Sequence, residues 1–183
     1  MSSLIRIWGT EPHERLLSFP CDRFIDHFND VYYRGITIQA KPEVVFQWLC
    51  QMRIAPYSYD WIDNFGRQSP QEIVPGLDEL EIGQEVMTIF ELVDFTYNKN
   101  FTIRLKKDMR AYKFFGDAAV SYVIIPKSNR RCRLLVKLLV QYPKRIAGML
   151  LRSILPLGDL IMMRRQLLNF KKLSEQKKEG IPA

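Results

Sequence analysis

The segment from Arg131 to Tyr142 most constrains how this chain can fold, because apolar and polar residues alternate along it. One side of the segment carries Cys132, Leu134, Val136, Leu138 and Val140, and the other carries Arg133, Lys137 and Gln141. This period of two is typical of a β-strand with one dry and one wet face. A sheet built from such strands needs another element to cover its apolar face.

Similar patterns predict further strands along the chain. Phe101, Ile103 and Leu105, for example, share one face of a run that places Arg104 on the other face. The predicted strands are Tyr33–Gln39, Gln84–Val93, Asn100–Lys107, Ala111–Phe115, Ala118–Pro126 and Arg131–Tyr142, the last two forming a hairpin across Lys127–Arg130.

Helical periodicity is predicted in three places. A first helix begins at Lys41-Pro42-Glu43 and ends before Pro56, since Pro and an acidic residue both favour a helix start. Lys144–Leu155 is predicted as a short apolar helix with basic edges, closed by Pro156. Asp159 then favours the start of a longer helix that runs to about Lys178. The apolar stripe of this last helix consists of Leu160, Met163, Leu167 and Phe170.

A length of 183 residues suits one domain, because two smaller units would each have a meagre core. We predict an α+β fold in which an antiparallel sheet curls around the long C-terminal helix and encloses an apolar cavity. Residues 1–32 are expected to form an N-terminal extension packed on the domain. The domain itself is expected to span residues 33–178, followed by a flexible tail at 179–183.

The apolar runs and the cysteines point to a cytoplasmic protein. The longest apolar stretch, Ile146–Met163, is interrupted by charged residues and a proline, so it falls short of the roughly 20 residues that span a bilayer. The start of the chain lacks the apolar run of a signal peptide. The three cysteines show no CxxC spacing, which indicates neither a disulfide framework nor a zinc site.

Positive charge is concentrated in the last third of the chain. Residues 127–178 contain 14 Lys and Arg against two acidic residues, whereas residues 1–126 are slightly acidic. This asymmetry suits either a solvated outer face or attraction to phosphate-bearing partners. An anionic membrane is one such partner, with Leu150, Leu151 and Ile154 inserted, although an ordinary lid helix would look the same. Nucleic-acid binding is disfavoured, because the basic region lacks interleaved aromatic residues and any recognised motif.

Several stretches resemble the START and polyketide-cyclase superfamily (SRPBCC), whose helix-grip fold has a β-α-α-β(n)-α order. Ile36–Leu49, with its Ala40-Lys41-Pro42 junction, looks like the opening strand and first helix of that family. Gln51-Met52 followed by Tyr57-Ser58-Tyr59-Asp60 resembles a phrase of an uncharacterised branch. Phe115–Tyr122 and Arg133–Val140 are similar to its last hairpin, and Gly158–Arg165 is similar to the start of its grip helix.

This resemblance covers about Tyr33–Glu175 and implies a pocket between sheet and helix that takes lipids, polyketides or other apolar molecules. Two functions follow from it. One is noncatalytic binding or transport of a hydrophobic small molecule, and the other is a cyclase or dehydratase acting on a polyketide-like substrate in the same cavity. No family catalytic residue can be transferred to this sequence, so no catalytic residue is assigned.

The residue types available for chemistry favour the binding protein. Both histidines, His13 and His27, precede the predicted domain, which makes a metal site or a histidine-activated nucleophile improbable, and no metal or cofactor is expected. Cys50 and Cys132 are interpreted as packing residues. Asp117 is interpreted as a turn residue and Arg104 as solvated.

Three groups of residues leave alternatives open. The aromatic cluster from Tyr57 to Trp61 either contacts a ligand or closes one end of the barrel. Tyr122 either aims its hydroxyl into the cavity or belongs to the core. Met149, Met162 and Met163 either fill the core or line an adaptable pocket. The predicted ligand-binding residues are Tyr57, Tyr59, Trp61, Phe90, Phe101, Ile103, Leu105, Phe114, Tyr122, Leu134, Val136, Leu138, Met163 and Leu167.

Overall fold

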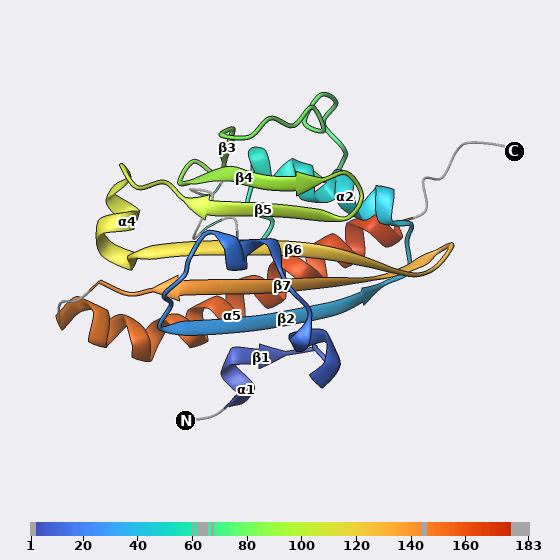
Figure 1. The fold of residues 1–183 in the computed structure, drawn as a ribbon. Helices are drawn as coiled ribbons and strands as arrows, with labels where there is room; N and C mark the ends of the chain where they lie inside the picture. Colours follow the sequence, from blue (N-terminus) through green and yellow to red (C-terminus); the bar gives the residue numbers. More distant parts are fainter. Residues whose placement is uncertain (1–2, 60, 62–65, 67, 144–145, 177–183) are drawn as a thin grey trace, which may run out of the picture.

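A seven-stranded sheet forms the centre of the computed structural model, which describes residues 3–59, 61, 66, 68–143 and 146–176 (Figure 1). The order across the sheet is β1-β2-β7-β6-β5-β4-β3. Neighbouring strands are antiparallel except for β1 and β2, which are parallel. The strands are β1 (Ile7–Trp8), β2 (Asp30–Ile38), β3 (Glu85–Val86), β4 (Phe90–Thr96), β5 (Asn100–Leu105), β6 (Asp117–Ser128) and β7 (Arg131–Gln141).

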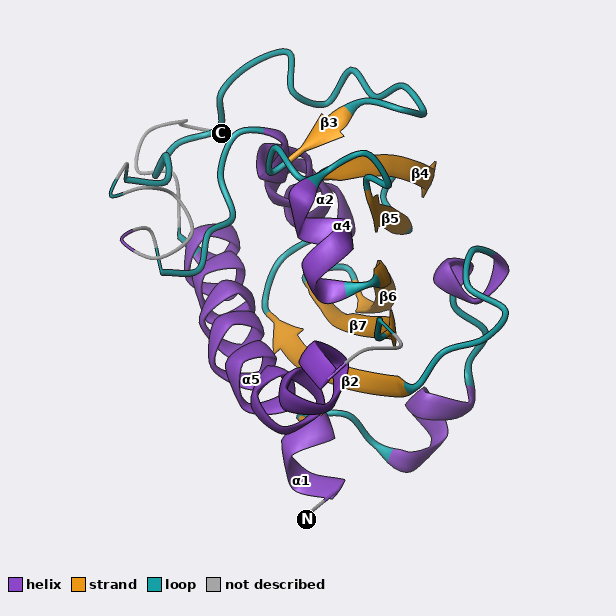
Figure 2. Cartoon of the chain, turned by 90° about the vertical axis from the view of Figure 1, so that its left-hand side faces the viewer, coloured by secondary structure: helices purple, strands orange, loops and turns teal. Residues whose placement is uncertain are grey.

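The inner face of the sheet is covered by the long helix α5 (Ile146–Glu175) and by α2 (Pro42–Cys50). Figure 2 shows α5 lying across this face. Leu167, Phe170 and Leu173 of α5 pack with Phe46 and Leu49 of α2 in the main core. The inner side of β7 is the one that alternation predicts, because Cys132, Leu134 and Val136 belong to the same core. The expected α+β, helix-grip architecture is therefore confirmed.

The outer face is covered by the segment that connects β1 with β2, which includes the 3-10 helices η1 (Pro12–Leu16) and η2 (Pro20–Arg23). Phe19, Cys21 and Ile25 of this segment pack on Leu135 and Leu139 of β7. In Figure 2 this segment and α5 lie on opposite sides of the sheet. The sheet is thus covered on both faces.

Ion pairs hold the connecting segment to the sheet. Arg133 donates to both carboxylate oxygens of Glu14, at 2.8 and 2.7 Å, and Glu14 is buried. Lys137 pairs with Asp22 at 2.6 Å. Arg133 and Lys137, on the side of β7 that the alternation predicts to be solvated, therefore bind the N-terminal segment.

The prediction of a strand at Ala111–Phe115 is wrong. This segment forms the helix α4 (Arg110–Phe115), which ends where Gly116 adopts a φ of +84°. A Cβ at Gly116 would also collide with the carbonyl oxygen of Gln141, so glycine is required there on both counts. The aromatic residues of this segment favour a strand by propensity. The segment nevertheless forms a helix, and the positive φ of Gly116 ends that helix.

Two other boundaries differ from the prediction. The expected strand Gln84–Val93 is divided into β3 and β4, because Met87 and Thr88 adopt positive φ angles that turn the chain. The two predicted C-terminal helices form the single helix α5, which contains Pro156 in its interior. Asp159 consequently lies inside α5 and does not cap a helix. The short helix α1 (Ser3–Arg6), the 3-10 helix η3 (Gln51–Arg53) and the interruption by α4 also depart from the expected β-α-α-β(n)-α order.

No helix within the described part of the chain is long and apolar enough to cross a membrane. The predicted tail at 179–183 and the side chains of Met149 and Leu150 lie outside the described residues.

Candidate functional site

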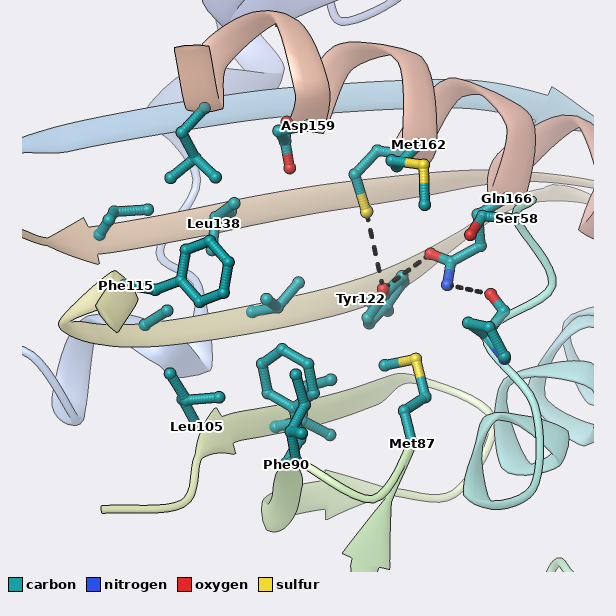
Figure 3. Close-up of a pocket in the computed structure, with 18 residues that line it drawn as sticks. Ser58, Met87, Phe90, Leu105, Phe115, Tyr122, Leu138, Asp159, Met162 and Gln166 are labelled. Carbon is teal, nitrogen blue, oxygen red and sulfur yellow. Dashed lines mark hydrogen bonds between the residues drawn. The ribbon is translucent and has the colours of Figure 1, made fainter. Parts of the chain in front are cut away.

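A pocket of about 250 Å³ lies between the inner face of the sheet and the middle of α5 (Figure 3). Its floor comes from β4, β5, β6 and β7, and its roof comes from the turns of α5 between Leu155 and Gln166. The lining residues are Pro56, Ser58, Met87, Ile89, Phe90, Ile103, Leu105, Phe115, Ala118, Val120, Tyr122, Leu138, Val140, Leu155, Asp159, Met162, Met163 and Gln166.

The sheet wall of the pocket is apolar because alternate residues of the central strands point inward. In each of these strands, one outward-facing residue separates a lining residue from the next. The lining residues include Ile103 and Leu105 of β5, Val120 of β6 and Leu138 of β7. Met162 and Met163 of α5 face these strands. Such a wall binds apolar ligand surface, and methionine side chains adapt to different ligand shapes.

One polar contact of the pocket joins β6 to α5. The Tyr122 hydroxyl donates to Oε1 of Gln166 at 2.8 Å, while Nε2 of Gln166 donates to the carbonyl oxygen of Pro56 at 2.6 Å. The carbonyl of Pro56 can only accept, which fixes the orientation of the Gln166 amide. Burial raises the pKa of Tyr122, so the hydroxyl remains protonated.

The second polar feature is a buried ion pair between α5 and β2. Nη2 of Arg34 donates to Oδ2 of Asp159 at 2.6 Å, and the two side chains are 1% and 8% exposed. The Arg34 guanidinium also donates to the carbonyl oxygens of Tyr33 and Ile5, which hold it in place. Burial raises the pKa of Asp159 to about 6, although the positive charge of Arg34 opposes this effect. Near neutral pH the carboxylate is therefore mainly ionised and faces the pocket (Figure 3).

Six of the residues predicted to bind ligand line this pocket together. They are Phe90, Ile103, Leu105, Tyr122, Leu138 and Met163. The sequence leaves open whether Tyr122 is a core residue or a cavity residue. It is buried and also contributes to the pocket wall.

The other eight predicted residues lie elsewhere. Phe101, Leu134, Val136 and Leu167 are on the expected inner side, but in the packed core. Tyr57 is buried in the same core between Trp48 and Phe170, and with Tyr59 and Trp61 it borders a separate, more polar hollow. Phe114 is 56% exposed, and its neighbour Phe115 lines the pocket instead. A ligand-binding role for these eight residues stays a prediction. For the three on strands, Phe101, Leu134 and Val136, alternation identifies the face but not the position along the strand.

Sequence reasoning missed Arg34, Asp159 and Gln166. Alternation along β2 contains a signal for Arg34, since Arg34 shares a face with Ile36 and Ile38. For Asp159 and Gln166 a signal exists only once α5 is treated as one continuous helix, in which both residues lie on the side of Met162 and Met163.

The remaining chemical candidates are structural. Arg104, predicted to be solvated, donates twice to Asp117 at 3.1 and 2.5 Å, and Asp117 lies in β6 and not in a turn. Burial raises the pKa of the Cys50 thiol to about 12 and that of Cys132 to about 11, which disfavours a reactive thiolate at either position.

Known proteins resemble this chain in their structure. No family model matches the sequence, and no curated protein matches it. Among solved structures, a hypothetical protein of Helicobacter pylori aligns with a TM-score of 0.57 and 13% identity over 87% of this chain and 96% of that one. The Zhui aromatase/cyclase of a Streptomyces species aligns with a TM-score of 0.56 and 12% identity, over 85% of this chain and the whole of the other. The chain has the START-like helix-grip fold.

A third structure with this fold is a protein of Chromobacterium violaceum, with a TM-score of 0.52 and 10% identity over 81% of this chain and the whole of that one. Identities this low concern the fold alone. The helix-grip arrangement nonetheless explains why the pocket lies where it does, because the grip helix and the curled sheet are the two surfaces that enclose it.

Proposed function

We propose that this protein binds a compact hydrophobic small molecule in the pocket between the sheet and α5. One observation carries the proposal. A mainly apolar wall from four strands and one helix converges on a few fixed polar groups, which is the usual composition of a ligand site. The apolar wall supplies affinity, and the carboxylate of Asp159, which faces the pocket, supplies orientation.

The size of the pocket narrows the class of ligand. A volume of about 250 Å³ lies just below the range of roughly 300 to 1,000 Å³ that is usual for ligand pockets. A molecule of one or two rings, or a short acyl chain, suits this space better than a phospholipid with two full chains. Among the lipid-like and polyketide-like ligands that the fold suggests, the smaller members are therefore favoured.

Binding can be tested by titrating the purified protein with an apolar fluorescent probe and by native mass spectrometry of the protein as purified. Ala118→Leu adds volume to the pocket wall, and it should reduce affinity for the probe about tenfold or more. The matched control is Ala111→Leu, the same change on α4 at a residue outside the lining. If neither method detects binding to the folded wild-type protein, the proposal is wrong.

A second candidate function is an enzyme of the cyclase or dehydratase type. It is favoured by the carboxylate of Asp159 in the pocket, whose charge adds to the effect of burial in raising the pKa of the Tyr122 hydroxyl. A carboxylate with a pKa near 6 can exchange protons near neutral pH, as general acid–base catalysis requires. The test is to incubate the protein with a short poly-β-ketone thioester and to look for a dehydrated ring product by mass spectrometry. An identical product distribution with wild type, Asp159→Asn and no protein would exclude this candidate.

Peripheral contact with an anionic membrane remains a prediction. The described part of α5 exposes Ile154, Leu157 and Ile161 at helical spacing, next to the exposed Arg152. We expect flotation with anionic vesicles to fall with added salt and in the variant Ile154→Glu/Leu157→Glu. Flotation that is absent, or that these changes leave intact, would remove the membrane from consideration.

A further inference from the structure

The hydrogen-bond donors of the pocket's polar side chains are already committed to protein partners. The proton of Tyr122 is directed to Gln166, and the amide nitrogen of Gln166 donates to the carbonyl oxygen of Pro56 and to Sδ of Met52. Ser58, which also lines the pocket, is not without a partner of its own. A ligand that offers only acceptors, such as a ketone or an ether, therefore meets no free donor from these residues.

Asp159 provides an acceptor. Its Oδ2 is bonded to Arg34, while its Oδ1 makes no hydrogen bond with any described residue. Figure 3 shows the carboxylate pointing from α5 toward the pocket, opposite Leu138 and Tyr122. A hydrogen bond to an ionised group is about twice as strong as one between neutral groups, so this oxygen is the strongest polar attraction for a bound molecule.

The charge balance restricts the donor further. Arg34 and Asp159 form a neutral pair, and both side chains are removed from water. An ammonium group would add an uncompensated positive charge to this site, and a carboxylate would be repelled by Asp159. A neutral hydroxyl can donate to Oδ1 without changing the net charge.

We infer that the pocket selects a neutral apolar molecule that carries a hydroxyl group, an alcohol or a phenol, which donates to Oδ1 of Asp159. This inference rests on the proposed binding function and names the ligand class for the same pocket. It predicts discrimination among ligands of equal shape by the presence of one proton donor.

The test is isothermal titration calorimetry of the wild-type protein at pH 7.5 with three probes that share one ring system. 2-Naphthol can donate a hydrogen bond, 2-methoxynaphthalene cannot, and 2-naphthoic acid is an anion. We expect 2-naphthol to bind about tenfold more tightly than the methyl ether, since one hydrogen bond to a charged group corresponds to at least that ratio. The acid should bind more weakly than either.

A double variant identifies the group responsible. Arg34→Met/Asp159→Leu replaces the ion pair with apolar side chains, which keeps the protein folded without a lone buried charge. In this variant 2-naphthol and the methyl ether should bind with equal affinity. Arg104→Met/Asp117→Leu removes a comparable ion pair outside the pocket lining, and it should preserve the discrimination.

The outcomes separate the inference from the function on which it rests. Equal binding of 2-naphthol and the ether to wild type overturns the hydroxyl preference while leaving the pocket as a binding site. Discrimination that survives in Arg34→Met/Asp159→Leu also overturns it, because another group must then recognise the hydroxyl. Failure of all three probes to bind overturns the inference together with the proposed function.

Discussion

The two faces of the sheet are covered in different ways. On the outer face, the N-terminal segment fills the surface with Phe19, Cys21 and Ile25 and is fixed by ion pairs to Arg133 and Lys137. On the inner face, α5 packs in the core through Leu167, Phe170 and Leu173 but leaves a pocket under its middle, between Leu155 and Gln166. The outer cover therefore contributes stability, whereas the inner cover combines stability with a pocket.

The largest effect is expected from breaking the ion pair of the inner face. Asp159→Leu alone leaves Arg34 buried without its counter-charge, so the free energy of unfolding should fall by about 4 kcal/mol. Chemical denaturation measures this loss. Adding Arg34→Met to the same protein should restore most of the stability. If the double variant is no more stable than the single one, the buried charge is not the cause of the loss.

A smaller loss is expected on the outer face. Leu139→Ala creates a space beneath the N-terminal segment and should lower the free energy of unfolding by about 3 kcal/mol. Probe affinity in the pocket should stay unchanged as long as the variant is folded, because Leu139 points away from the pocket. Leu157→Ala, at an exposed position of α5, serves as the control and should have little effect on stability. A parallel loss of affinity in Leu139→Ala would show that the two faces are coupled.

Tyr122→Phe tests the hydrogen bond between Tyr122 and Gln166 on the inner face. The substitution leaves Oε1 of the buried Gln166 without its donor and should cost about 1 kcal/mol of stability. The preference for 2-naphthol should persist, since Tyr122 donates to Gln166 and not to the ligand. Loss of the preference in this variant would show that Tyr122, and not Asp159, recognises the hydroxyl.

The smallest effect concerns pH. The pKa of Asp159 is raised to about 6, so its carboxyl becomes protonated as the pH falls from 7 to 5. A neutral carboxyl accepts a weaker hydrogen bond, and 2-naphthol should bind about threefold more weakly at pH 5 than at pH 7. For stability the sign is opposite. The folded state holds this proton more tightly than the unfolded chain does, so the contribution of Asp159 to stability declines as pH rises through 6.

The groups around Asp159 allow this pH effect to be assigned. Arg34 and Tyr32 face it from β2 and Tyr122 faces it from β6, and residues of these types do not change charge between pH 5 and 7. The two histidines of the chain, His13 and His27, belong to the N-terminal segment on the outer side. Calorimetry with the methyl ether, and with Arg34→Met/Asp159→Leu, should show no comparable change. A pH dependence that is equal for both probes would contradict the assignment.

Much of the architecture could be predicted from the sequence, because alternation and helical periodicity report which face of an element is buried. The inner side of β7 and the stripe of α5 around Leu167 and Phe170 follow directly from these periods. Periodicity does not distinguish the ends of a strand. Leu134 and Leu138 look alike in the sequence, yet Leu134 packs in the core that contains Leu167 and Phe170, and Leu138 lines the pocket.

The polar part of the candidate site was less accessible to prediction. An isolated charged residue in a strand is normally solvated, and Arg34 becomes plausible in the interior only when its partner is known. That partner, Asp159, follows a proline and therefore resembles a helix start. Whether Pro156 ends a helix or lies within one depends on tertiary packing, which cannot be predicted from the local sequence.

The separation of Arg34 and Asp159 along the chain has a consequence for biosynthesis. The two residues are 125 positions apart, and β2 must pair with β7 before Arg34 reaches its final place. Contacts between such distant segments are slow to form, because a long loop must close first. During synthesis on the ribosome, β2 emerges early and must wait for β7 and α5. The lining of the pocket is therefore complete only after β7 and α5, up to Gln166, have been synthesised.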